Sequence, residues 1–108
     1  MTNRKHSASA LAHMNAALSM IGRARKLTPE LMEEVSGQIR SATEMLLKPD
    51  PMTDRANFVL LAFRNSTRYT SKVIRGKLIE RVEVHDLGLY NWAMSQVHTY
   101  LIFQDNAA

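Results

Sequence analysis

The stretch that most constrains the fold lies near the C-terminus, over residues 86–104. It predicts a helix with apolar side chains on two sides. The first side, built on steps of three and four residues, comprises Leu87, Tyr90, Met94, Val97 and Leu101. The second, roughly opposite at about 100° per residue, comprises Leu89, Trp92, Ala93, Tyr100 and Phe103. A helix that is apolar nearly all round is either central in its domain or covered by a partner.

Two helices are predicted at the start of the chain. The first carries an apolar stripe over residues 11–21 and a serine cap at position 7 or 9. The second begins with Thr28 as N-cap and Pro29 in its first turn, where proline loses no hydrogen bond. Because the turn between them is short, they are expected to form an antiparallel hairpin. Gly37 is interpreted as a point of close packing on the alanine-rich first helix.

A third helix follows the break made by Pro49 and Pro51, which cannot both continue a helix. Thr53 or Asp54 is predicted to cap it. Its apolar run over residues 58–63 also fits a buried strand, but no partner strand is evident, so helix is preferred.

The segment 65–85 is ambiguous, because residues 65–71 contain few helix formers and residues 73–82 restore a helical rhythm. The alternatives are a continuous helix, a broken helix and, with less support, a short strand near Gly76 and residues 79–84. Asp86 is predicted to cap the last helix. The expected fold is therefore all-α: one domain, residues 1–108, forming a four-helix up-down bundle whose third helix is long or kinked. Residues 1–6 and 105–108 are expected to be loosely ordered.

Composition narrows the function classes. The chain has no cysteine, so thiol chemistry and cysteine-type zinc sites are excluded. Its four histidines lack metalloprotease spacing, and no glycine-rich phosphate loop or nucleophile elbow is present. Without a long apolar run or a secretory signal, the chain is expected to be cytoplasmic, non-enzymatic, and without a cofactor, metal or membrane partner.

Two partner surfaces are predicted. The leading hypothesis is a small helical regulatory or protein-interaction protein, a homodimer or a complex with another protein, because one domain of this size rarely encloses a helix fully. The predicted interface comprises Leu89, Trp92, Ala93, Tyr100 and Phe103.

The alternative function is nucleic-acid binding by a basic face of the third helix. Steps of four, four and three residues would bring four cations onto one side of a helix. They are Arg64, Arg68, Lys72 and Arg75. The net charge of +4 is modest and no recognition-helix motif is present, so a solvated outer helix face is the preferred explanation of this row.

Overall fold

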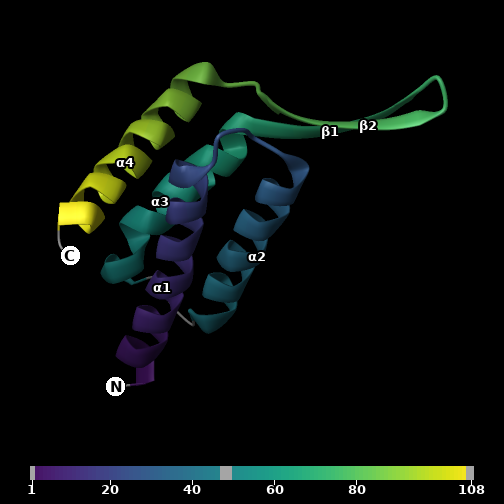
Figure 1. The fold of residues 1–108 in the computed structure, drawn as a ribbon. Coiled ribbons are helices and arrows are strands. Elements are labelled where there is room, and N and C mark those ends of the chain that lie inside the picture. The colour runs from purple at the N-terminus through teal and green to yellow at the C-terminus, as the bar shows by residue number, and fades with distance from the viewer. Residues whose placement is uncertain (1, 47–49, 107–108) are drawn as a thin grey trace.

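The computed structural model describes residues 2–46 and 50–106, with side chains for residues 7–46 and 50–105. The described residues form four helices and a two-stranded antiparallel hairpin. The hairpin projects away from the helices (Figure 1). The elements in chain order are α1 (Thr2–Arg23), α2 (Pro29–Met45), α3 (Pro51–Ser66), β1 (Thr67–Ile74), β2 (Lys77–Val84) and α4 (Leu87–Asn106).

The hairpin overturns the predicted all-α bundle with its long or kinked third helix. The described chain is an α+β arrangement in which α3 ends at Ser66 and strand β1 begins at the next residue. Strands β1 and β2 pair directly, from Thr67 opposite Val84 out to Ile74 opposite Lys77. The short-strand alternative for residues 79–84 was therefore correct for part of β2, but it did not include β1.

Local chemistry explains why these residues form strands. Branching at Cβ restricts χ1 in a helix and suits an extended backbone. Such residues in the two strands are Thr67, Thr70, Val73, Ile74, Ile79, Val82 and Val84. Arg75 and Gly76 lie between the strands with φ of 52° and 75°. Two consecutive positive φ angles are typical of a type I′ turn, whose twist matches that of a hairpin.

Helix caps follow the sequence signals at two of the four predicted places. Thr28 Oγ1 accepts from the Leu31 N–H at 3.1 Å, and Asp86 Oδ1 accepts from the Leu89 N–H at 3.0 Å, so both predicted caps are confirmed. The α3 cap was wrongly placed at Thr53 or Asp54. It is Asp50, whose Oδ1 accepts from the Met52 N–H at 2.8 Å and whose Oδ2 accepts from Ser7 of α1.

Other element boundaries also differ from the sequence analysis. Helix α1 begins at Thr2, ahead of the predicted serine cap, and α4 continues to Asn106. Residues 1, 107 and 108, within the predicted loose ends, lie outside the described residues, as does Pro49 of the predicted break.

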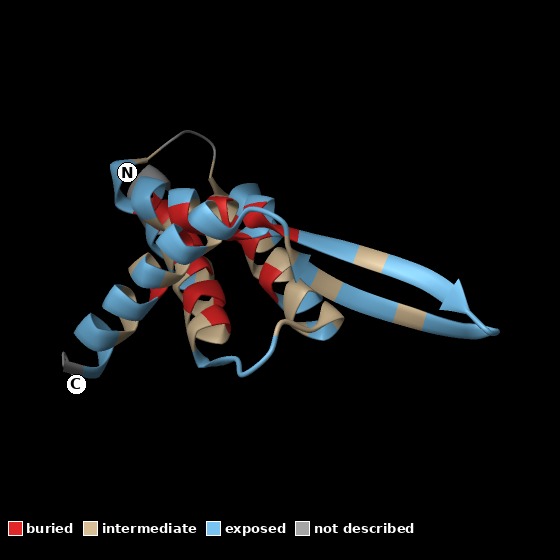
Figure 2. Cartoon of the chain, turned by 90° about the horizontal axis from the view of Figure 1, so that it is seen from above, coloured by how far each residue is buried: buried red, intermediate tan, exposed pale blue. Residues whose placement is uncertain are grey.

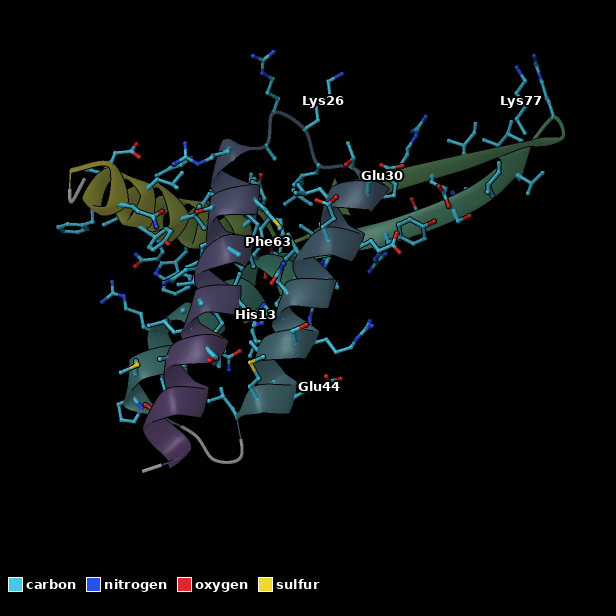
Figure 3. All side chains as sticks on the ribbon, turned by 60° about the horizontal axis from the view of Figure 1, so that its bottom comes forward. His13, Lys26, Glu30, Glu44, Phe63 and Lys77 are labelled. Carbon is cyan, nitrogen blue, oxygen red and sulfur yellow. The ribbon has the colours of Figure 1, made fainter. Side chains whose placement is uncertain are left out.

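Helix α1 is central in the body and packs against α2, α3 and α4 (Figure 1). Phe63 of α3 lies inside this body (Figure 3) and its ring packs against that of Tyr90 at 6.1 Å between centroids. Gly22 of α1 faces Val97 and Leu101 of α4. Fully buried apolar side chains come from all four helices: Ala10, Met14 and Ala17 of α1, Val35 and Ala42 of α2, Leu60 and Phe63 of α3, and Ala93 and Val97 of α4.

The hairpin stands clear of this body. The described chain extends 56 × 29 × 24 Å and has a radius of gyration of 15.3 Å, against about 13 Å for a compact chain of this length. Figure 2 shows that most of the arm is exposed and that buried positions are confined to its root. There the Ser66 carbonyl accepts from the His85 N–H at 3.0 Å and the Asp86 N–H at 3.4 Å. These bonds join the end of α3 to the start of α4.

Candidate nucleic-acid interface

The two faces of the hairpin differ in chemistry. Side chains alternate across a strand, and directly paired residues share a face. The register therefore gathers one set of side chains on what we call the cationic face: Arg68, Thr70, Lys72 and Ile74 from β1, and Lys77, Ile79, Arg81 and Glu83 from β2. The other, apolar face carries Tyr69, Ser71, Val73, Leu78, Glu80 and Val82.

Four cations form a row along the cationic face. Arg68 comes first, followed by Arg81, Lys72 and Lys77, alternating between the strands at intervals of two residues. Two residues of strand span about 7 Å, so the row covers about 20 Å. All four side chains are exposed, and Figure 3 shows Lys77 near the outer end of the arm. Glu83, opposite Arg68, is the one carboxylate on this face.

The arm also holds most of the protein's excess charge. Residues 67–84 carry five cations and two carboxylates, a net +3 against +4 for the whole chain. The fifth cation is Arg75 in the turn. A narrow projecting arm with this charge concentrates positive potential toward its outer end, beyond the helical body.

The predicted row of cations is only partly brought together. Arg68 and Lys72 share the cationic face, but Arg64 lies in the last turn of α3, beside Arg40 in a shallow groove, and Arg75 lies in the turn. The assignment of these residues to one helix face was wrong. A step of four residues is close to one helical turn and is also an even number, so it keeps side chains on one face of a strand as well.

Lys77 and Arg81 were missed, because their place beside β1 depends on the pairing register. Two sequence features together could have indicated the hairpin: the alternation of apolar and charged residues over 79–84, and Arg75–Gly76 as a turn.

The apolar face turns its root toward α2. The Tyr69 hydroxyl donates to Glu80, and both residues line a shallow depression with Glu30 and Glu33 of α2. The hydrogen bond to Glu80 is the largest cause of a raised pKa for Tyr69, above the ordinary 10.0. Figure 3 places Glu30 beside the root of the hairpin. Carboxylates thus gather on the side of the arm that faces α2, which leaves the cationic face as the one suited to an anion.

The predicted protein interface on α4 is divided by the structure. Ala93 is fully buried, and Leu89 and Tyr100 are partly buried against the body. Trp92 and Phe103 are exposed, at 40% and 71%. The Trp92 ring packs edge-on against Phe58 of α3 at 5.4 Å. These five residues therefore do not form one continuous exposed face.

The described residues do not bring potential metal ligands together. They contain no group of three or more histidine, aspartate or glutamate side chains placed to hold a metal ion. His13 bonds across to α2, with Nδ1 2.6 Å from Gln38 Oε1, and His98 is exposed on α4.

Comparisons with known protein families, curated proteins and solved structures gave no match. No helix in the described part of the chain is long and apolar enough to cross a membrane. The hairpin's own geometry therefore carries the functional argument.

Proposed function

We propose that the protein binds double-stranded DNA through the cationic face of its hairpin, as an accessory or regulatory factor acting in the cytoplasm. The observation that carries the proposal is the register, which aligns Arg68, Arg81, Lys72 and Lys77 on one exposed face. The major groove of B-DNA, about 12 Å wide, admits a two-stranded β-ribbon. Lysine and arginine on such a ribbon can contact the phosphates on both sides of the groove.

Two features favour a duplex over a single strand. Proteins that bind single strands stack bases on aromatic side chains. The cationic face has none, since the one aromatic residue of the arm, Tyr69, lies on the apolar face. The projection of the arm is the second feature, because it lets the ribbon enter a groove while the helical body stays outside.

Self-association through α4 stays a prediction with less geometric support. Ala93 is enclosed within its own body, so a second copy would contact mainly Trp92 and Phe103 together with Phe58 of α3. Sedimentation is the measurement for this prediction, and a mass of twice 12.2 kDa is the result expected of a homodimer.

The test of DNA binding is its salt dependence. Each phosphate contact contributes about 0.9 to the slope of log K against log [salt], so four contacts give about −3.6. Fluorescence anisotropy of a labelled duplex between about 50 and 200 mM KCl measures this slope. The double variant Lys72→Gln/Lys77→Gln should bind more weakly, with a slope of about −1.8.

A matched control removes two exposed cations from the turn between α1 and α2. The Arg25→Gln/Lys26→Gln variant has the same net charge as the hairpin variant. Under the proposal, it keeps the wild-type slope and most of the affinity. Equal slopes for the two double variants, or no binding by the wild type at about 50 mM salt, would refute the proposal.

A further inference from the structure

Helices α1, α3 and α4 border a second feature, an open groove of about 350 Å³ in the helical body. This volume lies within the range of small-molecule sites, about 300–1,000 Å³. Most of the lining is apolar, and a few polar groups converge on it. Its lining includes Leu18 of α1, Met52 and Arg55 of α3, and Tyr100 and Phe103 of α4.

One residue of the groove lining, Tyr100, has a hydroxyl without a hydrogen-bond partner. Among the side chains that the structure describes, the Tyr100 hydroxyl is the one buried polar atom without a hydrogen-bond partner. Buried hydroxyls are almost always paired, because leaving one unpaired forfeits its hydration without compensation. A ligand with a hydrogen-bond acceptor would supply the missing partner once the atoms that cover the hydroxyl move aside.

The groove also has an un-neutralised cation. Arg55 is exposed and donates from Nη2 to the uncharged Gln96 Oε1 at 2.8 Å. Between residues that the structure describes, the one ion pair joins Arg23 to Asp105, so no carboxylate neutralises Arg55. Its planar guanidinium is suited to a carboxylate, which it can bind through two parallel hydrogen bonds.

A ligand that fits this groove also needs an apolar part, because the groove has exposed apolar side chains. Met52 and Phe103 line the groove and are 51% and 71% exposed. Their surfaces would be covered by a hydrocarbon chain or ring lying between them. We propose that this groove binds a monocarboxylic acid with an apolar body, of the size of a medium-chain fatty acid, with its carboxylate on Arg55 and Tyr100. This site is independent of DNA binding by the hairpin.

The single tryptophan provides a reporter. Trp92 lines the neighbouring depression with Phe58, and that depression shares Arg55, Val59 and Gln96 with the groove. A carboxylate that draws Arg55 away from Gln96 changes the surroundings of the indole ring. Titration of the full chain with decanoate, followed by Trp92 emission and by calorimetry, should give saturable binding of one molecule per chain.

Variants separate this site from general apolar adsorption. Arg55→Gln should weaken decanoate binding about 10-fold or more, since hydrogen bonds to charged groups are strong. Arg25→Gln should leave decanoate binding unchanged, because Arg25 is an exposed arginine of the α1–α2 turn and does not line the groove. Decanol, with the same chain but no charge, should bind the wild type more weakly than decanoate and should bind Arg55→Gln as well as it binds the wild type.

Tyr100→Phe gives the second readout. The hydroxyl has no partner in the unliganded protein, so its removal should not lower the Tm, while decanoate affinity falls about 2- to 10-fold. Absence of saturable decanoate binding, or equal affinity of wild type and Arg55→Gln, would overturn the assignment. So would a sedimentation mass of twice 12.2 kDa combined with exclusion of decanoate, since a second copy would then fill the groove.

Discussion

Replacement of Gly22 by alanine adds one methyl group and tests how closely α4 packs on α1. A Cβ at this position would lie 2.9 Å from Val97 Cγ1 and closer still to Leu101 Cδ1. Ordinary carbon–carbon contacts are about 3.5–4.0 Å. Leu101 can turn aside because it is only partly buried, but Val97 is fully buried and its branched Cβ leaves one strongly preferred rotamer in a helix. The helices must therefore separate slightly to accept alanine.

The expected size follows from two opposing effects. Forcing an extra carbon into a packed interface costs about 1–3 kcal/mol. Replacing glycine by alanine returns at most about 1 kcal/mol of helix propensity, and less than this near a helix end such as Gly22. We therefore expect Gly22→Ala to lower the free energy of unfolding by about 1–2 kcal/mol, which lowers the Tm by about 4–8 °C for each kcal/mol in a domain of this size. Thermal and urea unfolding followed by circular dichroism measure both quantities.

Gly37 provides the matched control. It lies inside α2, and a Cβ there would meet nothing within 4 Å, so the sequence-based interpretation of Gly37 as a close-packing site was wrong. Gly37→Ala should therefore stabilise the protein by about 0.5–1 kcal/mol. In Gly22→Ala, the further change Leu101→Ala should cost less than it does in the wild type, because it relieves part of the clash. A Tm that rises in both glycine variants would show that α4 does not pack on α1 as described.

Four further outcomes are expected. Arg75→Asn should raise hairpin stability by a few tenths of a kcal/mol to about 1 kcal/mol, because asparagine tolerates the positive φ of 52° better, and hydrogen exchange of β1 and β2 amides measures the gain. Glu80→Gln should lower the pKa of Tyr69 toward 10.0, seen by tyrosinate absorbance, and an unchanged titration would remove the hydrogen bond as its cause. Because the folded-state pKa of Tyr69 is raised, its stabilising contribution is complete below pH 10.0 and is lost as pH rises through the folded-state pKa. Alkaline pH should therefore loosen the hairpin root more in the wild type than in Glu80→Gln, and hydrogen exchange of the root amides measures the difference. Thr28→Ala should cost about 1 kcal/mol through loss of the α2 cap, measured by urea unfolding, with Thr28→Ser retaining most of it.

Local signals predicted the helical body because each acts through neighbouring residues. The side chains of Thr28 and Asp86 bond to amides three residues on, so their positions in the chain suffice to identify them. The α3 cap was misplaced by a few residues, since Asp50, Thr53 and Asp54 are all chemically competent. The contact between Ser7 and Asp50 joins residues distant in sequence, and the sequence gives no sign of it.

The hairpin was harder to predict because two periods coincide in it. The interval from Arg68 to Lys72 fits a helix face and a strand face equally well. What decides between them is the pairing of β1 with β2, a property of two segments together. The grouping of the five α4 residues on one face was wrong for a related reason. Trp92 and Ala93 were grouped on one face, but only packing against α1 and α3 determines that Ala93 is buried and Trp92 exposed.

The hydrogen bonds at Ser66 hold the two ends of the arm together at one point of the helical body. Since the chain leaves and re-enters the body at one place, the distance between α3 and α4 does not depend on how many residues the arm contains. Insertion of two residues in each strand would lengthen the reach by about 7 Å and keep both faces intact. A single residue added to one strand would instead exchange the faces beyond it. Arm length is thus a variable that can change by even steps while the helical body stays the same.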